Sequence, residues 1–159
     1  MRAEYFTEAV VLDKEAIGEF DALVYLYTQQ LGRIRARVTS ARKITSKLNG
    51  HLEPLNLVQL RLVEKNRFQI ADVLKTGSLP VNQFKVLRLI KTIAPEAQPD
   101  GELWRLVTKG DLTEDRALKI LGFDKQFAAC QRCEGLEGLV FSTGDLAYFC
   151  RLCLNEEIL

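Results

Sequence analysis

The stretch Arg33-Ile34-Arg35-Ala36-Arg37-Val38 decides the fold of the first half of the chain. Apolar residues alternate with arginines, and successive side chains of a β-strand point to opposite faces. The stretch therefore predicts a strand with one apolar and one cationic face. Leu31-Gly32 marks a turn before it, and residues 20–30 form a further apolar-rich segment with the same period.

Other segments of the first half alternate in the same way. Val58, Leu60 and Leu62 alternate with polar residues, and residues 67–75 follow after a turn at Glu64-Lys65-Asn66. Residues 5–14 open the sheet. Five short strands with one longer loop fit a small closed barrel better than a sandwich.

The apolar spacing becomes helical after Pro80. Val86, Leu89, Ile90 and Ile93 fall at i, i+3, i+4 and i+7, which predicts a helix that stops at Pro95. Further helices are expected over about 99–109 and from Thr113 to near Gly122. The sequence thus predicts an α+β chain, with a barrel domain over 1–77 and a helical domain over 80–159.

Four cysteines form two close pairs near the end of the chain: Cys130, Cys133, Cys150 and Cys153. The pattern is C-x2-C-x16-C-x2-C, inside the window of a four-thiolate zinc site. We expect one structural Zn²⁺ in a module over about 128–155, with a small hairpin returning the second pair. Four thiolates leave no open coordination position, so this zinc would hold structure and activate no water.

Two other interpretations of the cysteines remain open: an empty reduced site or disulfides, and redox or catalytic thiols. Arg132 and Arg151 lie inside the two short turns and are interpreted first as counter-ions or solvated surface, and second as phosphate contacts. His51-Leu52-Glu53 has the H-x-E form of zinc deaminases, but Ala129 stands where their signature has proline. His51 is therefore interpreted as a loop residue.

Charge is segregated along the chain, although its 159 residues sum to a formal net charge of only +1. Residues 1–32 hold two basic and six acidic residues, net −4, whereas residues 33–47 hold six basic residues and no acid, net +6. A cationic strand face extended by a loop suits a phosphate track. The predicted DNA-binding residues are Arg33, Arg35, Arg37, Arg42, Lys43 and Lys47, with Tyr25 and Tyr27 as stacking surfaces.

Each of these residues also has a simpler interpretation. The arginines could form a solvated face paired with Glu4, Glu8 or Glu19, and the tyrosines could pack in the barrel. The strand register, which decides whether the tyrosines lie beside the arginines, does not follow from the sequence.

Composition narrows the class of protein. The hydrophobic fraction is 47% and the charged fraction 27%, typical of a globular chain and not of a disordered or collagen-like one. We find no signal-peptide pattern and no apolar run long enough for a membrane span, so we expect a soluble cytoplasmic protein without membrane partners. His51 is the only histidine, and no nucleophile–base pair can be assembled, so we expect no enzymatic activity.

An ordered set of short motifs resembles the RecO recombination mediators. The motifs are Thr7-Glu8-Ala9-Val10-Val11-Leu12, Gly18-Glu19-Phe20-Asp21, Tyr27-Thr28 to Leu31-Gly32-Arg33-Ile34, Ser46-Lys47-Leu48, His51-Leu52-Glu53-Pro54, and Leu118 to Gly122 before the cysteines. The resemblance implies an N-terminal OB-fold and a helical domain with a zinc module. It also implies a RecF-pathway mediator that binds single- and double-stranded DNA, anneals strands and helps load RecA.

The resemblance further implies RecR and the single-strand-binding protein as partners. Family members usually continue with further helices, whereas this chain stops six residues after Cys153, so we expect a short form. The family's docking pocket for the tail of the single-strand-binding protein is not assigned to residues here. Two rival functions stay open: an RNA-binding or ribosome-associated OB and zinc protein, and a protein-interaction adaptor whose basic patch meets an acidic partner.

Overall fold

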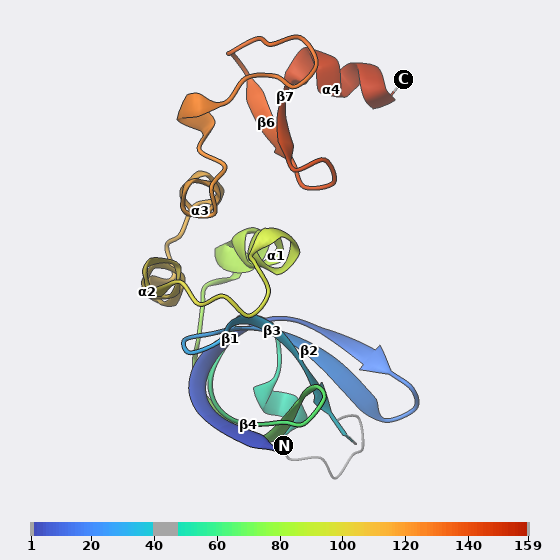
Figure 1. Ribbon diagram of the computed structural model, residues 1–159, viewed down its shortest axis with the longest axis vertical. Helices are drawn as coiled ribbons and strands as arrows, with labels where there is room; N and C mark the ends of the chain where they lie inside the picture. Colours follow the sequence, from blue (N-terminus) through green and yellow to red (C-terminus); the bar gives the residue numbers. More distant parts are fainter. Residues whose placement is uncertain (1, 40–47, 159) are drawn as a thin grey trace. The chain divides into compact units, whose positions relative to one another are not determined.

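The computed structural model describes residues 2–39 and 48–158, and its first half is built from five strands (Figure 1). The strands are β1 Ala3–Ile17, β2 Asp21–Thr28, β3 Gly32–Val38, β4 Asn56–Glu64 and β5 Phe68–Ser78. They pair in the order β1-β2-β3-β5-β4, and β4 returns to β1. This OB-like arrangement of five strands followed by helices confirms the predicted fold class.

The closing seam between β3 and β5 is short and parallel. Only two partner pairs join these strands, Ala36 with Phe68 and Arg37 with Gln69, whereas every other pairing in the barrel is antiparallel and longer. The barrel is therefore closed around most of its circumference by long ladders and at one place by a narrow link.

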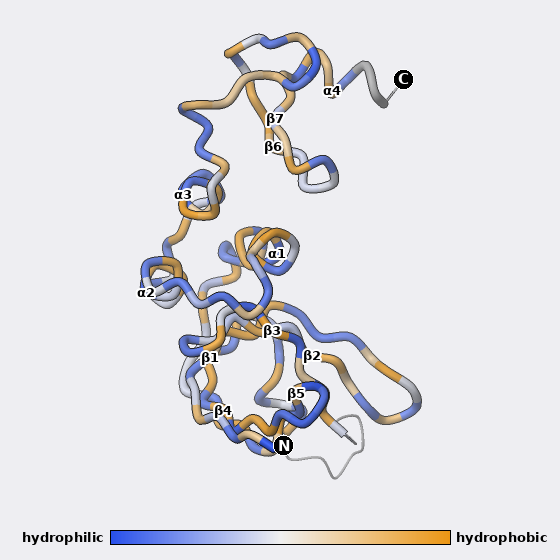
Figure 2. The backbone as a smooth tube through the Cα atoms, in the orientation of Figure 1, coloured by the Kyte–Doolittle hydropathy of each residue, from blue (hydrophilic) through white to orange (hydrophobic). Residues whose placement is uncertain are grey.

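The core of the barrel follows the period-two pattern. Ile34, Ala36 and Val38 are buried while the arginines between them point outward. β4 alternates in the same way, and β2 does so up to Leu26. Figure 2 shows hydrophobic and hydrophilic stretches following one another along the barrel. Burial of these alternating side chains supplies the hydrophobic stabilisation of the barrel.

β1 is longer than the sequence suggested because it serves two neighbours. Residues 3–10 pair with β4, and residues 9–17 pair with β2. A bulge between Val11 and Asp13 bends the strand from one partner to the next. The run Val10 to Leu12 is buried throughout, so the simple alternation breaks at this bend.

The second half of the chain contains short elements. Its helices are α1 Phe84–Ile93, α2 Gly101–Lys109, α3 Glu114–Ile120 and α4 Arg151–Ile158, and its strands are β6 Leu139–Ser142 and β7 Ala147–Cys150. Single 3-10 turns cover Asn49–His51, Val81–Gln83 and Lys125–Phe127. The sequence patterns indicated the first three helices but not α4. None of the described helices is long and apolar enough to cross a membrane.

The chain forms two compact units, the first ending at Leu112 and the second beginning at Thr113. The predicted division near residues 77–80 marks the end of the barrel, but α1 and α2 belong to the same unit as the barrel. Lys91 of α1 donates to Asp13 of β1 at 2.6 Å, and the backbone N–H of Asp100, at the start of α2, donates to the Tyr27 hydroxyl at 3.2 Å. These contacts link residues more than 70 positions apart, and no local pattern reveals them.

The segment 94–98, between α1 and α2, lies directly on the start of β3. The Ala97 N–H donates to the Arg33 carbonyl at 2.9 Å, and Arg33 Nε donates to the Ala94 carbonyl at 2.6 Å. Gly32 has φ +70°, and a Cβ there would lie 2.5 Å from the Gln98 carbonyl group. We call residues 94–98 the strap.

Candidate nucleic-acid interface and cysteine cluster

The four cysteines converge in the second unit. Their Sγ atoms all lie within 4.8 Å of one another, and Cys133 and Cys150 Sγ are 3.7 Å apart. A tetrahedral ion with metal–sulfur bonds of about 2.3 Å sets its sulfurs about 3.8 Å apart, whereas a disulfide needs about 2.05 Å. All four are free thiols, so the cluster is compatible with a four-sulfur zinc site.

A small hairpin brings the two pairs together, as the spacing predicted. Leu139 of β6 pairs with Cys150 of β7, and Cys153 follows in the first turn of α4. On the other side, Cys130 N–H donates to the Gly135 carbonyl at 2.8 Å and closes the first short turn. The Tyr148 hydroxyl donates to the Phe123 carbonyl at 2.7 Å and ties the hairpin to the preceding segment.

The thiols are not equivalent electrostatically. Backbone N–H groups of Cys133 and Cys150 point at Cys130 Sγ and lower the pKa of that thiol to about 6. Hydrogen bonding to the Cys150 thiol and burial raise the pKa of Cys153 to about 12. Metal binding requires thiolates, so an ion bound here would displace the protons that these thiols share.

Arg132 and Arg151 are both exposed, and Arg132 also contacts the cluster. Arg132 donates to the Cys153 carbonyl at 3.4 Å. Four thiolates around a divalent ion carry a net charge of about −2, which a nearby guanidinium would offset. This contact favours the counter-ion interpretation for Arg132.

The register of the barrel sets the tyrosines opposite the arginines. Arg33 pairs with Tyr27 and Arg35 pairs with Tyr25 across β2 and β3. Sequence reasoning left this adjacency open.

Arg33 contacts the strap, and Tyr27 contacts Asp100 just before α2. The Tyr27 side chain is 1% exposed, and its burial raises the pKa of the phenol above the ordinary value. Its hydroxyl accepts from Asp100, and Arg33 Nε is held by the Ala94 carbonyl. A stacking role for Tyr27 would require this part of the chain to move.

Tyr25, Arg35 and Arg37, the following outward positions on β2 and β3, are less buried than Tyr27. Lys91 Nζ lies 4.2 Å from the centroid of the Tyr25 ring, a cation–π contact. Arg37 Nε donates to Asp21 at 3.1 Å. Arg35 is exposed, with no hydrogen bond or ion pair to the described residues. Arg42, Lys43 and Lys47 lie outside the described residues.

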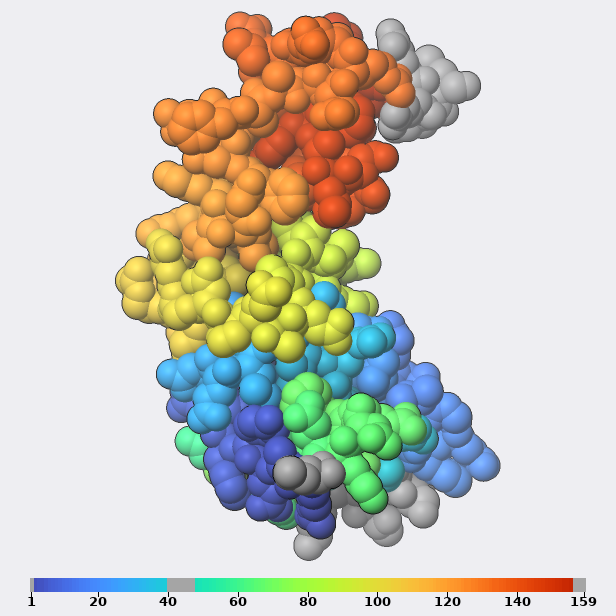
Figure 3. Space-filling view, in the orientation of Figure 1, coloured from blue at the N-terminus to red at the C-terminus, as the bar shows by residue number. Residues whose placement is uncertain are grey.

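A hollow of about 360 Å³ lies beside β3, and its lining includes one cation that sequence reasoning missed. Arg35 and Arg37 line it together with Arg67, which lies in the β4–β5 turn. A neighbouring hollow of about 400 Å³ adds Arg2 and Lys65. In Figure 3 the green β4–β5 turn lies beside the dark blue start of β1 on the surface.

This position matters because OB-folds bind oligonucleotides on the face of strands 2 and 3, between the loops that connect strands 1–2 and 4–5. Lys65 and Arg67 occupy the second of these loops. The sequence did indicate a turn here, with a cation on each side of Asn66. Those two cations point to a binding role only once the barrel topology shows that the turn is the loop between strands 4 and 5.

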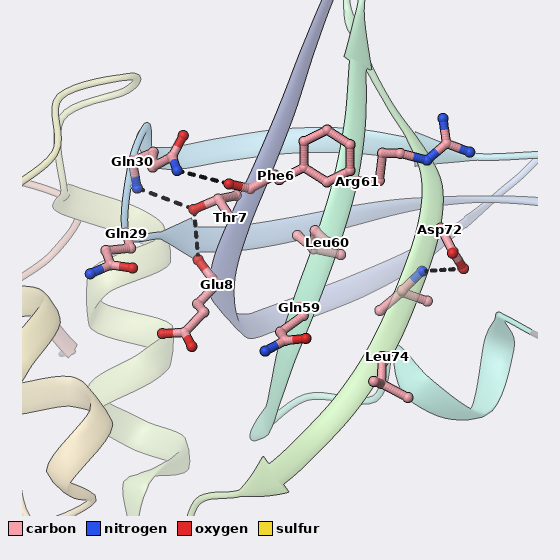
Figure 4. A pocket seen from close by; sticks show the side chains of 11 residues that line it. Phe6, Thr7, Glu8, Gln29, Gln30, Gln59, Leu60, Arg61, Asp72 and Leu74 are labelled. Carbon is pink, nitrogen blue, oxygen red and sulfur yellow. Dashed lines mark hydrogen bonds between the residues drawn. The ribbon is translucent and has the colours of Figure 1, made fainter.

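A third hollow, of about 560 Å³, lies on the outer face of β1, β4 and β5 (Figure 4). Its charged side chains are Glu8, Asp72 and Arg61, and Arg61 is 3.3 Å from Glu4. Polyanion binding is less favourable here because acidic groups outnumber the arginine, which is itself ion-paired.

Comparison with known proteins gives consistent results. The family model described as "Recombination protein O N terminal" matches residues 1–77. A curated relative named DNA repair protein RecO from Nocardioides sp. is 43% identical over 156 residues, covering 81% of this chain and 64% of the relative.

Two further relatives carry the same name. The one from Syntrophobacter fumaroxidans is 30% identical over 122 residues, covering 69% of this chain and 49% of the relative. The one from Thermodesulfovibrio yellowstonii is 27% identical over 179 residues, covering 96% and 71%. The chain thus spans less than two thirds of the Nocardioides and Syntrophobacter relatives. The matching N-terminal domain, the OB-like barrel and these relatives together identify the chain as a member of the RecO family.

Proposed function

We propose that this chain is a DNA-binding mediator of recombinational repair that acts without breaking covalent bonds. It binds single- and double-stranded DNA through the barrel, promotes strand annealing and helps load RecA in the cytoplasm. Contacts to phosphates make this binding largely independent of sequence. The names of the relatives support a role in DNA repair.

One observation carries the proposal: Arg35, Arg37 and Arg67 surround a hollow on the face that OB-folds use for oligonucleotides. Arg35 and Arg67 are exposed, and Lys65 extends the cationic surface along the turn. Arg37 contributes less positive potential because Asp21 neutralises it.

We also propose a structural Zn²⁺ in the second unit, held by Cys130, Cys133, Cys150 and Cys153. Such an ion cross-links the two ends of the hairpin module and supplies folding free energy. The convergence of the four Sγ atoms supports this assignment.

The proposal is tested by titrating labelled single strands with the double variant Arg35→Glu and Arg67→Glu. We expect affinity at low salt to fall at least tenfold, because two cations become two anions beside the phosphates. The log–log salt slope should become shallower by about 1.4, at about 0.7 per lost cation. The matched control is Lys85→Glu with Arg105→Glu, which changes the same charge at exposed positions of α1 and α2.

Unchanged affinity of the double variant would remove this face from the mechanism. Tighter binding of matched RNA strands in the same titration would favour the RNA-binding alternative. Absence of nucleic-acid binding at moderate salt would favour the protein-interaction adaptor. An annealing assay on strands coated with the single-strand-binding protein, with and without RecR, tests the two proposed protein partners.

A further inference from the structure

The hollow beside β3 contains groups that a track for phosphates alone does not need. Glu64 and Glu96 line it with the arginines, and Leu23 and Phe68 add apolar surface. A carboxylate repels a phosphodiester, so these two acids weaken the binding of a bare backbone at this point. Their presence indicates a ligand part that donates hydrogen bonds.

Glu96 is the more available of the two acids. It lies on the strap, where its backbone forms a bridge with Arg33, and its side chain is exposed. Its carboxylate has no hydrogen bond or ion pair to any residue that the structure describes. Glu64 accepts from the Tyr5 hydroxyl at 3.2 Å through one oxygen only.

Ionised carboxylates only accept hydrogen bonds, so the complementary ligand is a donor. The Watson–Crick edges of a single strand are open for such contacts, whereas those of a duplex are paired. Guanine has two adjacent donors there, N1–H and the N2 amino group, which can engage one carboxylate together. Adenine and cytosine offer one amino group each, and thymine has a single N–H flanked by two carbonyl oxygens that a carboxylate repels.

Size and surroundings fit the same ligand. A volume of about 360 Å³ lies at the small end of ligand sites, suited to one nucleotide. Leu23 and Phe68 provide apolar contact for a base, and the flanking Arg35 and Arg67 can hold the phosphates on either side of it.

We propose that this hollow is a subsite for one unpaired nucleobase whose Watson–Crick edge donates hydrogen bonds, with guanine as the best ligand and Glu96 as its acceptor. This inference rests on the proposed function, since it requires a DNA strand on this face. It adds a modest base preference at one position to binding that phosphate contacts make largely independent of sequence.

The test compares two single strands of about 16 nucleotides, the upper end of the site size of an OB-fold. One strand is all thymine, and in the other every fourth thymine is replaced by guanine. We expect the guanine-containing strand to bind about 5- to 10-fold more tightly, in the lower range for a carboxylate or amide reading a base. Inosine, which lacks the N2 amino group, should give an intermediate affinity, and a duplex of the same sequence should show no preference.

Glu96→Gln keeps the size of the side chain and removes its charge. We expect this variant to reduce the guanine preference to less than twofold while the thymine strand binds as well as before or slightly better. The matched control Glu102→Gln removes one exposed acid on α2 and should keep the full preference.

Two outcomes overturn the subsite and leave the proposed function standing. The first is equal, tight binding of both strands by the unmodified protein. The second is a Glu96→Gln variant that binds both strands more tightly by the same factor, so that the ratio of the two affinities stays the same. Glu96 would then act only through its charge. Absence of binding to either strand at low salt overturns the proposed function and the subsite together.

Discussion

Gly32 is a residue whose missing side chain is a structural requirement. Its φ of +70° disfavours any L-residue with a Cβ, and the backbone of the strap occupies the space that a Cβ would need. The turn between β2 and β3 and the packing of the strap on the barrel both depend on this position.

Gly32→Ala should lower the free energy of unfolding by about 2–4 kcal/mol, since it adds backbone strain and overpacking at one site. Urea-induced unfolding followed by fluorescence measures the change. Gly50→Ala is the matched control, because nothing lies within 4 Å of a Cβ added there and its φ is not positive. Its free energy of unfolding should therefore stay close to that of the unmodified protein. Equal stability of the two variants would contradict the close approach of the strap.

At single residues of β3, the sequence predicted side-chain direction but not long-range contacts. The alternation of Arg33 to Val38 predicted the strand and its two faces, because side-chain direction in a strand follows from local geometry. It did not predict that Arg33 is held by the strap or Tyr27 by Asp100, since those contacts join distant residues. Arg35, at the next outward position, stays exposed.

At the scale of elements, the docking of α1 on β1 and β2 creates the first compact unit. Lys91 donates to Asp13 at 2.6 Å and lies over Tyr25. Partial burial opposes ionisation of Asp13, but the hydrogen bonds from Lys91 and from the Lys14 N–H outweigh it, so the pKa of Asp13 falls below its ordinary value of 3.8. The hydrogen bond to Asp13 likewise raises the pKa of Lys91 above 10.5.

These shifts predict a stability that depends on pH. A carboxyl whose pKa is lowered by folding stabilises the protein above its unfolded pKa, and this contribution is lost as pH falls through the lower folded value. Asp13→Asn should therefore cost about 0.5–1 kcal/mol at pH 7, a small amount because both side chains are partly exposed. The difference from the unmodified protein should vanish near pH 2–3.

Chemical denaturation at both pH values measures this dependence, with Asp111→Asn as a control at an exposed position. A difference that persists at pH 2 would show that Asp13 acts through packing and not through its charge. The helical spacing of Val86 to Ile93 predicted α1 itself, but its contact with β1 joins residues 78 positions apart, which no local pattern reveals.

At the scale of the whole molecule, the two compact units are stabilised by different means. The first has a hydrophobic barrel core, whereas the second, beginning at Thr113, is small and contains the four cysteines. Small units of about 40 residues usually need a metal, disulfides or a partner to fold. The spacing of the cysteines predicted this module directly because ligand spacing is a local property, although it gave no indication of α4.

The proposed zinc can be removed independently of the barrel. A strong chelator should release about one zinc ion per chain and unfold the second unit while the barrel keeps its β-sheet signal. Metal analysis and amide hydrogen exchange, read separately for residues before and after Leu112, follow the two events. The double variant Cys150→Ser with Cys153→Ser should reproduce the result without chelator, and a chain purified without zinc yet protected beyond Leu112 would contradict it.

The barrel should open first at the short seam between β3 and β5. β3 is tied to β2 by seven partner pairs and to β5 by two, so thermal fluctuations should separate β3 from β5 before any other ladder breaks. Arg35 and Arg37 lie on one side of this line and Arg67 lies just before β5 on the other. A nucleic-acid strand bound to all three arginines would bridge β3 and β5 and hold the seam closed. Amide hydrogen exchange along the seam should therefore slow when a strand is bound to the barrel.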